Sequence, residues 1–352
     1  MKWEWIDDQA GLTRALSQPD EFIGVDTEFV REDTFWPKPG LIQIGNAEQV
    51  YLVDPLAELD FEDFQVWMAN PEQVKVTHAG FEDLELFAHH FATQPSPWFD
   101  TQLAWACLGG PLSIGLDGLV QAFGHAPLDK SKSRNDWTRR PLAQDLLDYA
   151  AQDVVHLPAI ARELRQQLID QDRLSWLMEE QAAVLERIQG LLSNAFDPMD
   201  RVKGLHNLSG QGMATMRAMV GWRDETARSQ NQARSRIVRD ELLLNLADCE
   251  RWPDLSTLPG YRGGATRRHA DALRERFEAG RAGPAEDALP KPSRPSPAQK
   301  KANQAMKAAV NACAERHALA PEFLARRKDI EAWAGGKSGP QGWRKALLKE
   351  WI

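Results

Sequence analysis

The sequence predicts an α/β domain with a mixed sheet, followed by a basic region made only of helices. Short β-branched segments follow one another closely over residues 22–54 and then alternate with helical segments up to about residue 161. Residues 209–350 contain no segment with the pattern of a strand. A chain of 352 residues is too long for one ordinary core, so we expect two or three domains.

The first half begins with a helix and three strands. The expected elements are a helix over residues 9–18 and strands over 22–29, 41–45 and 50–54. Because the connections between these strands are short, they favour an antiparallel meander. Residues 30–40 contain two prolines and a glycine and are therefore expected to form a loop.

Helices and strands then alternate. We expect helices at 58–69, 81–91, 101–108 and 116–123, strands at 74–78 and 98–100, and one long helix from about 142 past 161. This pattern predicts a five-stranded mixed sheet in a domain of residues 1–200. Helical segments in the second half cover 209–228, 238–249, 265–280, 298–318 and 321–334. A proline-rich linker at 284–297 divides them into two small units, 205–283 and 298–352.

Composition argues against several classes of protein. No apolar stretch approaches the ~20 residues that cross a bilayer, and the acidic start is unlike a signal peptide. The three cysteines (Cys107, Cys249 and Cys313) show no paired spacing, which argues against disulfides and a zinc site. We expect a cytoplasmic monomer with no membrane partner and no disulfide partner.

The two halves of the chain carry opposite charge. Residues 1–200 contain 14 Lys and Arg against 34 Asp and Glu, whereas residues 201–352 contain 28 against 17. This asymmetry suggests a polyanion as the partner of the basic half. The alternative is a pair of solvated surfaces with no partner.

Two carboxylates lie near the end of the first core strand. Asp26 and Glu28 are two residues apart, so their side chains point to the same face of the strand. Two like charges on a core strand repel each other and lose solvation. A hard divalent cation between them would offset both costs. The alternative is a harmless exposed strand, because Asp-x-Glu alone is common.

Two later helices supply more candidates. Asp83 lies in the first turn of the helix after strand 74–78, where an acid commonly stabilises the helix dipole. Tyr149 and Asp153 are four residues apart and share one helix face. Ala150 and Ala151 keep this helix thin, so that another surface can approach it closely. Each of these residues, taken alone, also fits an ordinary structural role.

Together and in order, these motifs resemble the DEDD 3′→5′ exonucleases of the tyrosine subclass, and within them the ribonuclease D family. The matching segments are 25–31, 40–44, 78–85, 99–102, 128–131 with 136–137, and 149–154, so the resemblance covers about residues 3–200. It implies a ribonuclease H-like fold. It also implies a 3′→5′ exoribonuclease that releases 5′-mononucleotides, with transfer-RNA precursors as substrates.

The resemblance assigns a role to each motif residue. Asp26, Glu28 and Asp153 would hold one divalent ion, Asp26 would bridge to a second ion, and Asp83 would assist through water. Tyr149 would orient the attacking water, and Glu28 would also bind the terminal 3′-hydroxyl. All-oxygen ligation suits Mg²⁺ or Mn²⁺, and two such ions could hold the attacking and leaving oxygens of a phosphodiester.

Other side chains near these motifs could contact the substrate. Phe35 and Trp36 could stack on bases, or they could pack under their own loop. The cations of the connector, Lys130, Lys132 and Arg134, could bind phosphates, or they could belong to a solvated loop. His78 is a further candidate, although a histidine at a strand end is more often hydrogen-bonded within the core. Trp137 is expected to be a core anchor.

The basic half resembles HRDC domains, which are small helical nucleic-acid-binding modules. The match lies in residues 237–243 and 255–260, and Arg234-Ser235-Arg236 replaces a proline often found there. Residues 298–352 are interpreted as a second, degenerate copy. The cations of both units could bind phosphates or pack against the acidic domain. A DNA exonuclease of the same fold and an inactive nucleic-acid-binding adaptor are the alternative functions.

Overall fold

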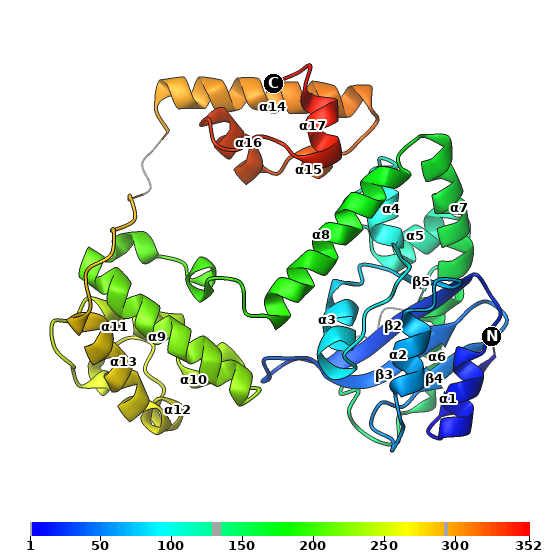
Figure 1. The fold of residues 1–352 in the computed structure, drawn as a ribbon, viewed down its shortest axis with the longest axis horizontal. Helices are drawn as coiled ribbons and strands as arrows, with labels where there is room; N and C mark the ends of the chain where they lie inside the picture. Colours follow the sequence, from blue (N-terminus) through cyan, green and yellow to red (C-terminus); the bar gives the residue numbers. More distant parts are fainter. Residues whose placement is uncertain (1, 129–134, 292–294) are drawn as a thin grey trace. The chain divides into compact units, whose positions relative to one another are not determined.

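The computed structural model describes residues 2–128, 135–291 and 295–352, and it divides into two compact units (Figure 1). The first, here the sheet unit, contains Met1–Val30, Pro39–Leu192 and Pro295–Ile352. The second, here the helical unit, contains Arg31–Lys38 and Ser193–Arg294. None of the helices in the described part of the chain has both the length and the apolar character that a membrane span requires.

A mixed sheet forms the centre of the sheet unit. Its strands in the described residues are β1 (Trp3–Ile6), β2 (Phe22–Val30), β3 (Lys38–Gly45), β4 (Val50–Val53), β5 (Val74–Thr77) and β6 (Trp98–Asp100). Their order is β1-β4-β3-β2-β5-β6. β3 runs antiparallel to β4, whereas β1–β4, β2–β5 and β5–β6 are parallel pairs.

The prediction of five strands is wrong because it missed β1. This edge strand has four residues, too few to show a periodic pattern. It pairs in parallel with β4, with Trp3 opposite Val50. A parallel partner so far along the chain leaves no local sequence signal, since strand preference depends strongly on the neighbouring strand.

Side chains alternate between the two faces of β2, and each face packs against a different layer of helices. Ile23 and Val25 share a core with side chains of α1 (Gln9–Leu16), α2 (Glu62–Met68) and α3 (Phe81–His90). Phe22 belongs to the other core, with α4 (Thr101–Cys107), α5 (Leu116–Ala122), α6 (Gln144–Val155), α7 (Leu157–Asp170) and α8 (Leu174–Leu192). Asp26 and Glu28 have the same parity as Phe22 and therefore face this second layer.

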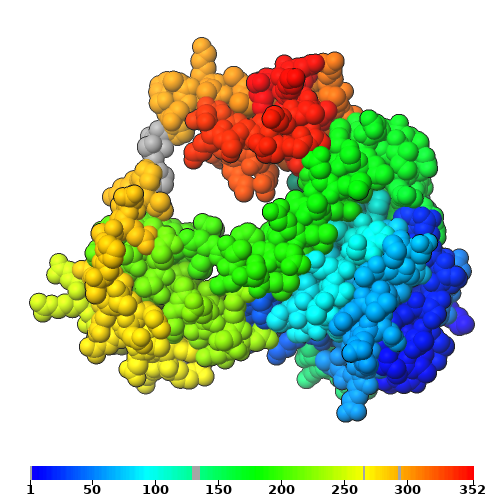
Figure 2. Space-filling model, viewed as in Figure 1, coloured from blue at the N-terminus to red at the C-terminus, as the bar shows by residue number. Residues whose placement is uncertain are grey.

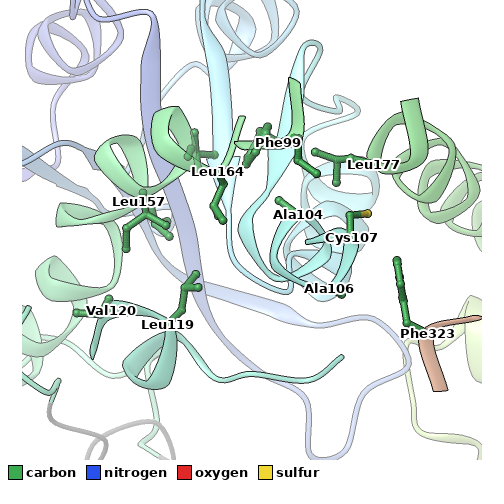
Figure 3. Close-up of a cluster of buried hydrophobic side chains, with 14 of the residues drawn as sticks. Phe99, Ala104, Ala106, Cys107, Leu119, Val120, Leu157, Leu164, Leu177 and Phe323 are labelled. Atoms are coloured by element: carbon green, nitrogen blue, oxygen red, sulfur yellow. The ribbon is translucent and has the colours of Figure 1, made fainter. Parts of the chain in front are cut away.

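The second layer has a densely packed core (Figure 3). Figure 3 shows Phe99, Leu164 and Leu177 around Ala104, with Cys107 close by. Each large apolar side chain buried in this way contributes about 1.5–3 kcal/mol relative to its exposed state. The α4–α8 layer therefore forms a well-packed support for the strand that carries Asp26.

The single long helix predicted from residue 142 past 161 is in fact two helices. α6 ends at Val155 and α7 begins at Leu157. Pro158 lies in the first turn of α7, where its missing N–H costs nothing. The same proline cannot continue the hydrogen-bond ladder of α6, so the helix breaks at His156.

The carboxyl-terminal helices pack against the sheet unit rather than forming a separate compact unit. They are α14 (Pro297–Arg316), α15 (Pro321–Leu324), α16 (Arg327–Ala334) and α17 (Gly342–Leu348). Trp343 stacks on Trp176 of α8 with ring centroids 4.6 Å apart, and Arg344 forms an ion pair with Glu180. Figure 2 shows these orange-to-red residues in contact with the green helices. The segment predicted as residues 298–352 thus shares the core of Figure 3 through Phe323.

The helical unit is built around two long helices. Its elements are η1 (Pro198–Arg201), η2 (Leu205–Asn207), α9 (Gly210–Ser229), α10 (Arg234–Ile237), α11 (Asp240–Ala247), η3 (Leu255–Thr257), α12 (Gly263–Arg268) and α13 (Ala270–Ala282). α9 and α13 pack so closely that a Cβ at Gly280 would lie only 2.5 Å from the Cα of Thr215. Met216, Leu242 and Phe277 lie in the shared core. The absence of strands predicted for residues 209–350 is confirmed for the described residues of that range.

Candidate active site

Gly24 brings helix α6 close to strand β2. A Cβ at this position would lie 2.6 Å from the carbonyl oxygen of Val154 and 3.1 Å from that of Gly45. Val154 follows Asp153 directly, so this approach places Asp153 beside Asp26. Ala150 and Ala151 are fully buried, as expected for a thin helix face. Sequence reasoning missed Gly24, although a glycine inside a strand often marks a close backbone approach.

Asp83 reaches the site from the opposite helical layer. It lies in the first turn of α3, and its side chain is only 6% exposed. The hydroxyl of Thr27, which points away from the face of Asp26 and Glu28, donates a hydrogen bond to the Asp83 carboxylate. Sequence reasoning missed Thr27, because the middle residue of Asp-x-Glu gave no signal until its partner helix was known.

The four carboxyl groups are close enough that the charge of Asp83 raises the pKa of the other three. Burial raises the pKa of Asp26 well above its usual value, and the charges of Asp83, Asp153 and Glu28 raise it further. Burial and the charges of Asp153 and Asp83 raise the pKa of Glu28 to about 9. Burial and the Asp83 charge raise the pKa of Asp153 to about 7. Burial also raises the pKa of Asp83 to about 6, although the Thr27 hydrogen bond opposes the increase.

This donor set fits a hard divalent cation, because it consists only of carboxylate oxygens. Asp26, Glu28 and Asp153 are half-buried, so protein surrounds each of them while one side remains open to solvent. Among the described residues, no three His, Cys, Asp or Glu side chains stand in a ready-made metal-binding arrangement.

Without divalent metal, the free energy of unfolding should fall as the pH rises from about 4 to about 9. Glu28, Asp83 and Asp153 have folded-state pKa values of about 9, 6 and 7, above their ordinary values of 4.5, 3.8 and 3.8. The folded state therefore binds more protons over this interval, and raising the pH removes that stabilisation. Each unit of pKa difference corresponds to about 1.4 kcal/mol.

Urea denaturation in chelator at a series of pH values measures this dependence. Adding Mg²⁺ should flatten the slope, because a bound cation replaces the protons as the neutralising charge. Metal-free stability that stays constant or increases between pH 5 and pH 8 would contradict the mutual repulsion of these carboxylates.

Tyr149 projects from the same face of α6 as Asp153 and is half-buried. Its ring lies 6.1 Å from that of Trp137, centroid to centroid, with an angle of 34° between the planes. Trp137 is fully buried, which confirms that it is a core anchor. The structure thus brings Asp153, Asp26, Glu28 and Asp83 together around the second half of β2, and Tyr149 lies one turn before Asp153 on α6.

His78 already uses both ring nitrogens within the domain. Nδ1 lies 2.9 Å from the hydroxyl of Thr101, and Nε2 lies 2.9 Å from the carbonyl oxygen of Ile114. These contacts fix the segment that leads into α5. They favour the structural alternative for His78 over contact with substrate.

Phe35 and Trp36 pack in the helical unit. Trp36 is 7% exposed, and its backbone N–H donates to Oδ1 of Asn231 at 2.9 Å. The guanidinium groups of Arg228 and Arg234 lie 4.8 and 4.3 Å from the centre of the Phe35 ring. The packing alternative therefore holds for Trp36, whose ring is too buried to stack on a base.

The segment Arg234-Ser235-Arg236 contacts the loop that carries Phe35 and Trp36. Arg236 Nε donates to Asp33 at 2.8 Å, and the N–H of Ala233 donates to the Asp33 carbonyl at 2.9 Å. Arg234 also pairs with Asp224. These arginines are engaged in protein contacts. The other predicted substrate contacts, Lys130, Lys132 and Arg134, lie outside the described residues.

Comparison with known proteins gives a consistent result. Residues 3–169 match the 3′-5′ exonuclease family. The chain is 34% identical to ribonuclease D of Pseudomonas paraeruginosa, over 98% of this chain and 95% of that protein. It is 33% identical to ribonuclease D of Escherichia coli, over 93% and 91%. The crystal structure of Escherichia coli RNase D, described as an exoribonuclease involved in structured RNA processing, matches with a TM-score of 0.85 at 31% identity, over 99% of this chain and 97% of that one.

Proposed function

Because this chain belongs to the ribonuclease D family and is a 3′→5′ exoribonuclease, we propose that it trims the 3′ ends of structured RNA precursors, among them those of transfer RNA, by two-metal-ion hydrolysis. The supporting observation is the cluster of four carboxyl groups from β2, α3 and α6, beside one tyrosine. Four clustered carboxylates repel one another, and this cost is hard to explain in a domain that binds no cation. We place this activity in the cytoplasm.

Asp26, Glu28 and Asp153 would hold one divalent ion, and Asp26 would bridge to a second. Mg²⁺ or Mn²⁺ suits these oxygen ligands. Such ions, when bound, lower the pKa of water and neutralise charge on the attacking and leaving oxygens. Asp83 keeps one carboxylate oxygen on Thr27, which leaves it suited to a contact through water rather than to full ligation.

Tyr149 would orient the attacking water from the α6 side of the site. A free tyrosine, which titrates at ~10, is scarcely ionised at neutral pH, so the role proposed for this residue is to position the water. Glu28 would accept a hydrogen bond from the terminal 3′-hydroxyl. Recognition of that hydroxyl would direct hydrolysis to the last phosphodiester and release one 5′-mononucleotide in each cycle.

The helical unit would hold the RNA through exposed cations, as an HRDC domain of residues 205–283. Arg262, Arg267 and Arg268 are exposed around α12, so phosphates can reach them. Because Arg234 and Arg236 bind other parts of the chain, we assign RNA contact to the α12 side instead. Residues 298–352 would be a degenerate HRDC copy that serves to support α8.

Digestion of matched 3′-extended RNA and DNA oligonucleotides tests this function. We expect ordered release of 5′-mononucleotides from RNA with Mg²⁺ or Mn²⁺, and none in chelator. Equal or faster digestion of DNA would favour the DNA exonuclease. Binding without release from either polymer, at any metal concentration, would favour the inactive adaptor.

A further inference from the structure

Arg140 joins three segments of the sheet unit that are far apart in sequence. Its Nε donates to Oδ2 of Asp54 at 2.8 Å, and its Nη2 donates to the carbonyl oxygen of Gly40 at 2.6 Å. Its Nη1 donates to the carbonyl oxygen of Trp137 at 2.9 Å. The guanidinium also lies over the ring of Trp5, 5.5 Å from its centre. One side chain thus ties the segment after β4, the strand β3 and the segment before α6.

These contacts need the shape of arginine. A guanidinium presents its donors in a planar fork, so it can bind a carboxylate with two hydrogen bonds and still reach carbonyl oxygens. Asp54 is buried, and both its oxygens accept from Arg140. A lysine would keep the charge but could not make this set of bonds. Arg139, its neighbour in sequence, has an 84% exposed side chain and offers a matched comparison.

The network fixes the position of Trp137. A Cβ at Gly40 would lie 2.6 Å from the Cβ of Trp137 and 2.8 Å from its carbonyl oxygen. The backbone at residue 137 is therefore pressed against β3, and Arg140 holds its carbonyl group there. The Trp137 ring, which is fully buried, packs against Tyr149. A shift of Trp137 would remove the surface against which the Tyr149 ring rests.

We propose that Arg140, paired with Asp54, is a positioning residue that sets the orientation of Tyr149 through Trp137. This inference rests on the role of Tyr149 in the proposed function. Arg140 does not touch the carboxylate cluster in any contact described above, so its effect is on turnover rather than on metal or RNA affinity. Misplacement of a catalytic group by about 1 Å costs on the order of 10²-fold in rate. Loss of the Arg140 network should therefore lower kcat by about 10–100-fold and leave KM within about threefold.

A double-mutant cycle on RNA hydrolysis tests this coupling. Arg140→Lys and Asp54→Asn should each lower kcat, whereas the matched control Arg139→Lys should equal the wild type. In a Tyr149→Phe background, Arg140→Lys should cause no further loss, because the group that it positions has been removed. An equal loss in both backgrounds would overturn the proposal, since it would show that Arg140 acts independently of Tyr149.

A second measurement needs neither metal nor substrate. The chain has three tyrosines, so labelling with 3-fluorotyrosine gives three ¹⁹F resonances, and the one that disappears in Tyr149→Phe belongs to Tyr149. In chelator, Arg140→Lys should shift or broaden that resonance and leave the resonance of Tyr261, in the helical unit, unchanged. An unchanged Tyr149 resonance in a folded Arg140→Lys protein would overturn the proposal.

The two measurements separate this inference from the proposed function. If the wild-type protein hydrolyses no RNA, the proposed function fails, and the ¹⁹F spectra still decide whether Arg140 positions Tyr149. If Arg140→Lys does not fold, Asp54→Asn provides the same test, because without its charge partner the Arg140 guanidinium is no longer held beside the carbonyl oxygen of Trp137.

Discussion

Replacement of Asp26 by asparagine should abolish RNA hydrolysis and stabilise the metal-free protein. Asparagine has the same size but no charge, so the site loses the ligand proposed to bridge both ions. We expect activity to fall by at least ~10³-fold, because in the proposed mechanism charge neutralisation by the ions would be the main source of rate. Burial and three neighbouring carboxylates disfavour the Asp26 charge. Removing it should therefore raise the free energy of unfolding at pH 8.

Mononucleotide release and urea denaturation, both measured on the same preparation, check the two parts of this prediction. Asp145→Asn is the control, because it removes an exposed carboxylate from the first turn of α6, outside the cluster. Its activity should match the wild type. An Asp26→Asn protein that retains a tenth of wild-type activity would rule out Asp26 as the bridging ligand, whatever its stability.

Replacement of Tyr149 by phenylalanine should lower kcat by about 10²–10⁴-fold, the usual range for the loss of a proton-transfer or water-positioning group. Phenylalanine keeps the ring that packs against Trp137, so the fold should be unaffected. The Mg²⁺ concentration for half-maximal activity should stay within about threefold of the wild type, because the proposed ligands are carboxylates.

Single-turnover hydrolysis across a range of Mg²⁺ concentrations measures both quantities. Tyr51→Phe, which removes a hydroxyl from β4 in the core shared with α1, α2 and α3, is the matched control. Tyr149 has no part in the reaction if Tyr149→Phe turns over as fast as the wild type. A large change in Mg²⁺ dependence would instead make it part of the metal site.

The residues of the candidate site could be predicted because their spacings are local and because, taken together and in order, they resemble a known family. The two-residue spacing of Asp26 and Glu28 and the four-residue spacing of Tyr149 and Asp153 define faces without any knowledge of the fold. Gly24 could not be recognised in the same way. Gly24 matters because α6 approaches β2 closely at this point. The residue that it contacts there, Val154, is 130 positions later in the sequence, so no local pattern indicates the contact.

Non-local packing also explains the features that were missed or misread. β1 depends on pairing with β4, and its four residues carry too little pattern of their own. Trp36 suggested an exposed aromatic because its partner, Asn231, is 195 residues away. The break between α6 and α7 is different, because its cause, Pro158, is local. The sequence therefore contained the signal for two helices, although we predicted one.

The loop at residues 31–38 affects how the protein can be divided. This loop continues directly from β2, yet its side chains complete the core of the helical unit. A fragment that ends near residue 200 would therefore carry Phe35 and Trp36 without their partners, and exposed aromatics of this size promote aggregation. Modular exchange of the helical unit between relatives would have to include two pieces of sequence, residues 31–38 and 193–294. In evolutionary terms, Phe35 and Arg234 should vary together, although 199 positions separate them.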